Sequence, residues 1–109
     1  MKLLTTLAVA CGLMTASIAN AAVDAAAAQA LLKASKCTAC HAVDKTKAAS
    51  SFKDVAKKYK GKAGAQDKLV KHVTTKPMVE KDGEKMPHSA VKTSNAAEVR
   101  NLVDWILSQ

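Results

Sequence analysis

The residues with the most specific chemistry form one short segment, Cys37-Thr38-Ala39-Cys40-His41. In a Cys-x-x-Cys-His segment, the two thiols can add to the two vinyl groups of haem, and the adjacent histidine can ligate its iron. The sulfurs lie about one helical turn apart, which suits one edge of the macrocycle, and the histidine then projects beneath its centre. The segment predicts one covalently bound haem c, attached through Cys37 and Cys40, with His41 as an axial iron ligand.

Three other kinds of site use the same residue types. A zinc site needs four ligands, and the segment could supply three of them, with the fourth from His72 or His88. A thioredoxin-like dithiol follows a strand in a βαβ unit, which this helical sequence lacks. A disulfide between Cys37 and Cys40 would close a very small, strained loop. Haem attachment is the preferred interpretation, and a zinc or dithiol module remains the alternative.

A six-coordinate iron needs a second axial ligand from further along the chain. The candidates are His72, Met78, Met86 and His88. We favour Met86, which precedes Pro87 in a stretch expected to be irregular, where a methionine has little packing role. Met78 follows a proline instead of preceding one, and both histidines lie in lysine-rich surroundings where we expect surface side chains. Methionine ligation would raise the reduction potential relative to histidine.

The elements that position these residues are predicted to be helices. Asp24 can cap a helix that runs through alanines to Leu31, Leu32 and the Cys-x-x-Cys-His segment, because alanine and leucine favour helix. Ser51 is predicted to begin a second helix, with Asp54 three residues on as in a capping box. The apolar stripe of this second helix comprises Phe52, Val55, Ala56 and Tyr59.

The middle of the chain predicts one more short helix and then a loop. Gly61 is expected to end the second helix. A third helix is predicted from Ala65 to about Val73, and Lys76 before Pro77 disfavours its continuation. Its inward-facing residues are predicted to be Leu69, Val70 and Val73. Residues 77–94 are expected to form a loop.

The last helix has the clearest pattern. Asn95, with Glu98 three residues later, is a start signal. One continuous apolar stripe follows, made of Val99, Leu102, Val103, Ile106 and Leu107. No strand-like alternation of useful length occurs, so the predicted fold class is all-α.

The first 21 residues are typical of a secretory signal peptide. Lys2 is followed by an apolar stretch and then by small residues up to Ala21, after which we expect cleavage. Cys11, within the apolar stretch, is not expected to carry a lipid. The remaining chain, residues 22–109, has no run of about 20 apolar residues, so no membrane span is predicted. Export would place the protein where bacteria attach c-type haem.

Composition indicates a small core and a positive surface. The 109 residues include one Trp, one Tyr and one Phe, so a core made of protein alone would be thin, and a porphyrin would supply the missing apolar bulk. The formal charge is +8, and loss of Lys2 leaves +7. Such a surface would steer the protein toward acidic partners, an effect that fades as salt rises. An exported chain with so few aromatic residues is not expected to bind nucleic acid.

The mature chain as a whole resembles the small monohaem bacterial cytochromes c of class I. The resemblance rests on the attachment segment after an alanine-rich helix, on residues 51–59, on Met86-Pro87 and on the closing residues 102–107. It implies a cytochrome c domain over residues 22–109, in which the N- and C-terminal helices pack around one covalently bound haem. The region of Leu31 and Leu32 would then lie against Trp105. The resemblance also implies axial ligation by His41 and Met86 and electron transport in the periplasm.

The chain departs from the family pattern in two places. Members usually carry Gly-Pro before the second helix, where the proline carbonyl accepts a hydrogen bond from the haem-ligating histidine. The corresponding residues here are Ala49 and Ser50, and the Ser50 carbonyl could accept that bond. Near the distal ligand, a charged stretch from Glu80 to His88 replaces the usual glycine-rich one, so we expect Met86 to bind less firmly.

These observations predict an electron carrier and not an enzyme. With both axial ligands from the protein, the iron has no open position for a substrate and can only change its oxidation state. We expect a monomer whose redox partner proteins are acidic at the surface that contacts it. Two alternatives remain: a haem enzyme or ligand sensor in which Met86 is labile, and the zinc or dithiol module.

Overall fold

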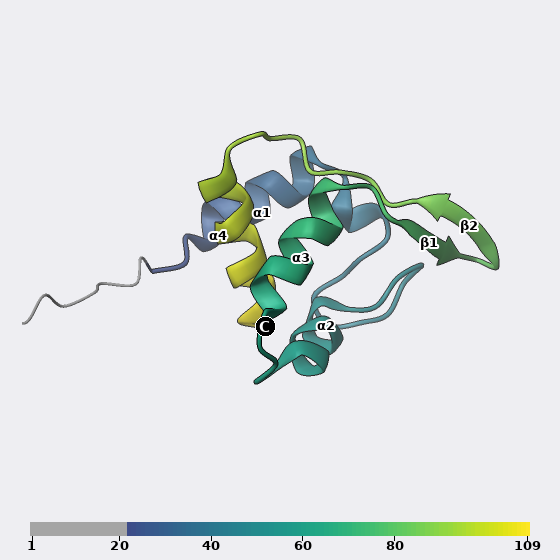
Figure 1. Cartoon of the computed structure of the whole chain (residues 1–109). Coiled ribbons are helices and arrows are strands. Elements are labelled where there is room, and N and C mark those ends of the chain that lie inside the picture. The colour runs from purple at the N-terminus through teal and green to yellow at the C-terminus, as the bar shows by residue number, and fades with distance from the viewer. Residues whose placement is uncertain (1–21) are drawn as a thin grey trace, which may run out of the picture.

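The computed structural model describes residues 22–109, so the predicted signal peptide over residues 1–21 and Cys11 lie outside the described residues. Within residues 22–109 the chain forms helices and one antiparallel hairpin (Figure 1). The elements are α1 (Ala25–Ala34), the 3-10 helix η1 (Cys37–Ala39), α2 (Phe52–Tyr59), α3 (Ala65–Thr74), β1 (Met78–Lys81), β2 (Glu84–Pro87) and α4 (Ala96–Leu107). No helix in this part of the chain is long and apolar enough to cross a membrane.

Helix α1 begins as predicted and ends earlier than predicted. The backbone N–H of Ala27 donates to the Asp24 carboxylate at 2.9 Å, which caps the helix. Lys36 adopts a left-handed conformation with φ 58°, which an α-helix does not accommodate. The prediction that the helix continues into the cysteine segment is therefore wrong: η1 is a separate turn after this break.

Helix α2 and the chain that follows it match the sequence prediction. The Ser51 hydroxyl accepts a hydrogen bond from the Asp54 backbone N–H at 3.1 Å, which confirms the predicted start. Helix α2 ends at Tyr59, and Gly61 follows with φ 72°, a left-handed conformation that glycine adopts without steric cost. Helix α3 then covers the predicted third segment, with Leu69 buried.

The core forms where α1, α2 and α4 meet. Its buried residues are Ala28, Leu32, Phe52, Leu102, Trp105 and Ile106, with Leu31 packed against them. Figure 1 shows α1 and α4 overlapping on one side of the molecule, where the two helices pack against each other. The predicted contact of the Leu31–Leu32 region with Trp105 is confirmed. Asn95 caps α4 by accepting hydrogen bonds from the N–H groups of Ala97 and Glu98.

The expectation of a loop over residues 77–94 is wrong for its first half. Strands β1 and β2 pair in an antiparallel hairpin, which Figure 1 shows extending away from the helices. The two-residue connection is Asp82-Gly83, and both residues have positive φ, 53° and 82°. Positive φ at both positions is typical of the hairpin turn whose twist matches that of paired strands. The hairpin is small, and the fold remains predominantly helical, in line with the predicted class.

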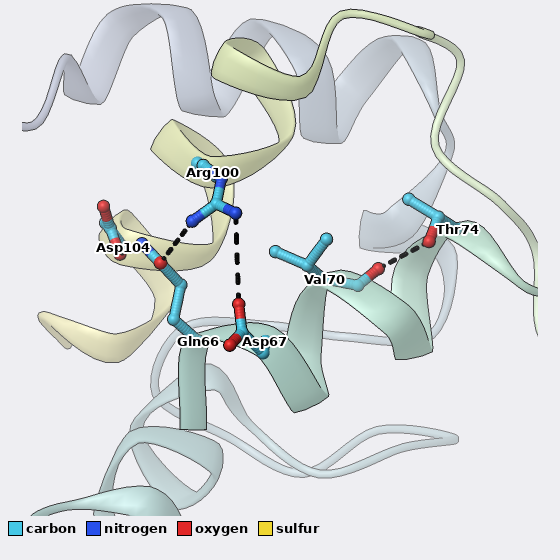
Figure 2. A network of polar contacts seen from close by, with 6 residues as sticks. All are labelled: Gln66, Asp67, Val70, Thr74, Arg100 and Asp104. Carbon is cyan, nitrogen blue, oxygen red and sulfur yellow. Dashed lines mark hydrogen bonds and ion pairs between the residues drawn. The ribbon is translucent and has the colours of Figure 1, made fainter. Parts of the chain in front are cut away.

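Polar side chains join α3 to α4. Figure 2 shows Arg100 of α4 reaching toward Gln66 and Asp67 at the start of α3. The Arg100 guanidinium donates to the Gln66 side-chain oxygen at 2.8 Å and lies 4.0 Å from the Asp67 carboxylate. The Gln66 amide in turn donates to Asp104 at 2.6 Å. These contacts fix α3 against the core, so that the other face of α3 can form one wall of the cavity next to η1.

Candidate functional site

The two cysteines lie at the edge of a cavity, Cys37 at the start of η1 and Cys40 directly after it. The backbone N–H groups of Cys40 and His41 both donate to the Cys37 carbonyl, at 3.2 and 3.0 Å, which makes the segment a tight turn. Both thiols are free and half-buried. Burial raises the pKa of the Cys37 thiol above its ordinary value, so this sulfur stays protonated at neutral pH.

His41 is held in a defined orientation by two neighbours. Its Nδ1–H donates to the Ser50 carbonyl at 2.7 Å, which confirms the acceptor predicted from the sequence. Its ring stacks on the Phe52 ring, with centroids 5.1 Å apart and planes inclined by 17°. Because Nδ1 carries the proton, Nε2 keeps a free electron pair for a metal. The Ser50 carbonyl therefore does what the family's proline carbonyl was expected to do.

A cavity of 450 Å³ lies beside these residues, and both cysteines and His41 line it. Helix α3 and the hairpin supply the facing walls. The apolar side chains that contribute to the lining include Leu32, Val55, Leu69, Val73, Val79 and Ile106. An apolar cavity with thiols and an oriented imidazole at its edge can hold a flat, largely apolar group that is bonded to the protein at one side.

The two candidate methionines differ in their position relative to the cavity. Met86 lies on β2 opposite Val79, lines the cavity, and is 41% exposed. Met78 is 64% exposed and is not among the residues that line the cavity. Met86 thus reaches the predicted site, whereas Met78 does not.

The structure also brings His72 and His88 to the cavity. Both line it, and their ring centroids are 4.5 Å apart. The centroid of His88 lies 6.3 Å from that of His41. The expectation that His88 is a surface side chain is wrong, because its Nδ1 atom is buried and has no hydrogen-bond partner among the described residues. Leaving such an atom unpaired costs about 1–3 kcal/mol, which a bound partner would offset.

Burial also affects the charge of these two histidines. It lowers the pKa of His88 below its ordinary value, and the neighbouring His41 adds to the effect. Burial likewise lowers the pKa of His72, with further contributions from His88 and His41. Both imidazoles are therefore neutral at pH 7, the form that can ligate a metal.

A sequence signal for His88 existed. His88 lies two positions after Met86, and residues two apart in an extended segment point to the same face. Any argument that turns Met86 toward the cavity therefore turns His88 toward it as well. The spacing is informative only where the backbone is extended, and the sequence predicts an irregular loop over residues 77–94.

The zinc alternative lacks its ligand set in this arrangement. Among residues 22–109, no group of three or more His, Cys, Asp or Glu side chains is placed to hold a metal ion. A structural zinc site requires four such ligands in tetrahedral geometry. The site fits a large planar group better than a single ion.

Comparison with known proteins agrees with this geometry. The family model for cytochrome c matches residues 25–109. The chain belongs to the cytochrome c family. A cytochrome c-551 from Allochromatium vinosum is 40% identical over 77 residues, which are 71% of this chain and 80% of that protein. A cytochrome c-551 from Pseudomonas aeruginosa is 35% identical over 79 residues, covering 72% of this cytochrome and 73% of the relative.

Solved structures confirm the predicted class I fold. The class 1 cytochrome MtoD from Sideroxydans lithotrophicus ES-1 is 44% identical to this cytochrome, with a TM-score of 0.76. The match covers 80% of this chain and 97% of that one. Cytochrome c552 from Nitrosomonas europaea is 28% identical with a TM-score of 0.58, over 73% of this chain and 96% of its own.

Family membership gives this cytochrome one covalently bound haem c and the role of an electron carrier. The residues present fit that group. Paired thiols lie at one edge of an apolar cavity, an oriented imidazole offers a free nitrogen, and a buried nitrogen of His88 lacks a partner. The bound haem supplies an iron that gains and loses one electron. The protein surrounds such a group with apolar side chains.

Proposed function

We propose that this cytochrome is exported to the bacterial periplasm after removal of residues 1–21 and there carries single electrons between redox proteins. Its haem is attached through Cys37 and Cys40, and His41 is one axial ligand. The observation that carries this proposal is the hydrogen bond from His41 Nδ1–H to the Ser50 carbonyl, which leaves Nε2 free beside both thiols.

Two side chains on the other wall of the cavity can supply the second axial ligand. They are Met86, which the sequence predicts, and His88. With either one bound, the iron has two protein ligands and no open position for a substrate, which favours electron transfer over catalysis. Fixed ligation in both oxidation states also keeps the structural change on electron transfer small.

The charge near the cavity supports acidic redox partners. Lys36, Lys58 and Lys81 contribute to its lining and outnumber the carboxylates there, Asp54 and Glu80, and the chain from residue 22 onward has a formal charge of +7. Two haem propionates would reduce this to about +5, which is enough to steer an anionic partner. Electron transfer by a monomer at this positive face is the arrangement that we propose.

The test is the haem content of the full chain produced in a bacterial host that attaches c-type haem. We expect haem that resists acid–acetone extraction and a reversible one-electron reduction with a sharp reduced α-band. The Cys37→Ala, Cys40→Ala double variant should lose covalent haem, whereas Met78→Ala, at an exposed position outside the cavity, should retain it. A wild-type protein without covalent haem would overturn the proposal.

A further inference from the structure

We propose that Ser35 is a positioning residue for the second axial ligand of the haem iron. Its hydroxyl joins the segment that carries this ligand to the end of α1. The proposal deepens the proposed function and rests on it. It holds whether the ligand is Met86 or His88, because both lie in the stretch from β2 to Lys92.

The burial of Ser35 points to a specific partner. Among residues 22–109, the buried polar residues are Ser35 and Ser51, and Ser51 caps α2. Ser35 directly follows α1 and is 4% exposed. Its hydroxyl accepts a hydrogen bond from the Lys92 backbone N–H at 2.9 Å, a partner 57 residues away in the sequence. Burying a hydroxyl is costly unless it forms a hydrogen bond, so this contact explains how Ser35 is accommodated.

The Ser35 hydroxyl joins two walls of the cavity from behind. Ser35 is not among the residues that line the cavity, but Lys36 and Cys37, which follow it, both are. On the other wall, the four residues from Met86 to Ser89 line the cavity, and Lys92 lies three positions further on. The hydrogen bond therefore connects the wall that holds the thiols to the wall that carries the second ligand.

The other hydrogen bonds of this segment lead to different elements. The His88 N–H donates to the Pro77 carbonyl at 2.8 Å, which closes the base of the hairpin. The Val91 N–H donates to the Val73 carbonyl at 3.0 Å, which joins the segment to α3. Within residues 22–109, the bond to the Ser35 hydroxyl is the one hydrogen bond between residues 88–92 and the end of α1. Its acceptor is a side chain, so a single substitution can remove it.

Loss of this bond should loosen the second ligand. Without the Ser35 hydroxyl, the Lys92 N–H lacks its acceptor, and the segment after β2 is no longer held to the wall with the thiols. The protein ligand should then leave the iron in a larger fraction of molecules. The apparent affinity of an external iron ligand rises in proportion to that fraction. One hydrogen bond is equivalent to a change of about twofold to tenfold.

The test measures cyanide binding to the ferric, haem-loaded protein through the shift of its Soret band. Cyanide binds the iron only in molecules where the second protein ligand has left. Ser35→Ala should bind cyanide about twofold to tenfold more tightly than the wild type. Ser35→Thr keeps a hydroxyl and should stay close to the wild type. Lys92→Pro removes the N–H donor and should match Ser35→Ala, with Lys92→Gln as its control for the lost charge.

Ser108→Ala is the matched control for a general loss of stability. Ser108 follows α4 as Ser35 follows α1, but its hydroxyl donates to the Trp105 carbonyl within its own helix. This variant should bind cyanide as the wild type does. Far-UV circular dichroism establishes that each variant is folded under the conditions of the measurement.

Two results would overturn the proposal. One is wild-type cyanide affinity in a folded Ser35→Ala variant, and the other is an equal gain in Ser108→Ala. Where Ser35→Ala does not fold, the comparison of Lys92→Pro with Lys92→Gln decides, and equal affinities for these two variants also count against the proposal. Absence of covalent haem from the wild type is a different result, which overturns the proposed function instead.

Discussion

At the scale of single residues, the site depends on how the His41 ring is held. Ser50 provides a backbone carbonyl where the family commonly has a proline carbonyl, so the hydrogen bond is kept and only the stiffness of the preceding chain differs. The Phe52 ring adds the second constraint. It stacks on His41 and makes an edge contact with Trp105, with centroids 5.8 Å apart. Phe52 therefore connects His41, the proposed iron ligand, to the core.

Replacing Phe52 tests this connection. Phe52 is 4% exposed, and Phe52→Ala removes a buried ring, so we expect the free energy of unfolding to fall by about 3–5 kcal/mol. Phe52→Leu keeps most of the apolar volume and should cost less than half as much. Urea denaturation of the haem-loaded protein followed by circular dichroism measures both. Equal losses for the two variants would show that ring stacking on His41 matters more than buried volume.

The sequence allowed prediction of part of the site and not of all of it. Cys37, Cys40 and His41 are predictable because their spacing is fixed along one short segment. The Ser50 carbonyl is predictable through its position before α2. The spacing of His88 from Met86 predicts only that the two share a face; where that face lies depends on how the segment after β2 packs on α3, where the Val91 N–H donates to the Val73 carbonyl.

At the scale of elements, local signals are sufficient to predict the starts of the helices but not the hairpin. The caps of α1, α2 and α4 are side chains that bond to nearby N–H groups, so a few adjacent residues specify them. The hairpin also had a local signal, Asp82-Gly83, which is a strong turn dipeptide. The residues that flank this dipeptide are mostly charged, so the apolar–polar alternation that indicates a strand is weak. The sequence therefore predicts a loop where the structure has two strands.

The turn provides a prediction for the hairpin. Gly83 has φ 82° and nothing within 4 Å of an added Cβ, so Gly83→Ala introduces backbone strain alone. We expect a loss of about 1–2 kcal/mol in the free energy of unfolding. The exposed Lys85→Ala, on the same hairpin, serves as the control and should change stability by less than about 0.5 kcal/mol. Thermal unfolding of the ferric protein measures the difference, and equal melting temperatures for both variants would contradict the strained turn.

The cap of α4 gives a second prediction at this scale. The Asn95 side chain accepts hydrogen bonds from two backbone N–H groups, at 2.9 and 3.3 Å. Asn95→Ala leaves both without this acceptor and should lower the free energy of unfolding by about 0.5–2 kcal/mol. Asn95→Ser retains a capping oxygen and should recover most of the loss. Chemical denaturation with both variants checks the ranking, which fails if serine is no better than alanine.

At the scale of the whole molecule, the helical core and the cavity beside η1 are adjacent and share side chains. The core between α1, α2 and α4 includes side chains that also line the cavity, among them Leu32, Phe52 and Ile106. The cavity between η1, α3 and the hairpin is lined by apolar groups that need a filling group. The shortage of large side chains in the sequence indicates such a group. The position of the cavity depends on the packing of α3 against α4, which Gln66 and Arg100 join (Figure 2).

The positive charge beside this cavity determines how the molecule should react with charged electron acceptors. Lys36, Lys58 and Lys81 contribute to the cavity lining together with Asp54 and Glu80, and the chain from residue 22 onward has a formal charge of +7, so an anion that approaches the haem meets a net positive field. Oxidation of the ferrous protein by ferricyanide should therefore slow as ionic strength rises, because salt screens charges over about 8–10 Å. Oxidation by a cationic cobalt complex should accelerate instead.

Charge variants locate the source of this effect. The triple replacement of Lys36, Lys58 and Lys81 by glutamine should slow oxidation by ferricyanide about threefold to tenfold at low ionic strength, since local charge of one sign raises the association rate of an opposite charge. Lys68→Gln, on the exposed face of α3 and outside the cavity lining, should have a much smaller effect. Stopped-flow measurements over a range of salt concentrations separate the two. If the triple variant and Lys68→Gln slowed the reaction by the same factor for each charge removed, net charge alone would steer the partner. The three lysines that line the cavity would then have no special role in electron transfer.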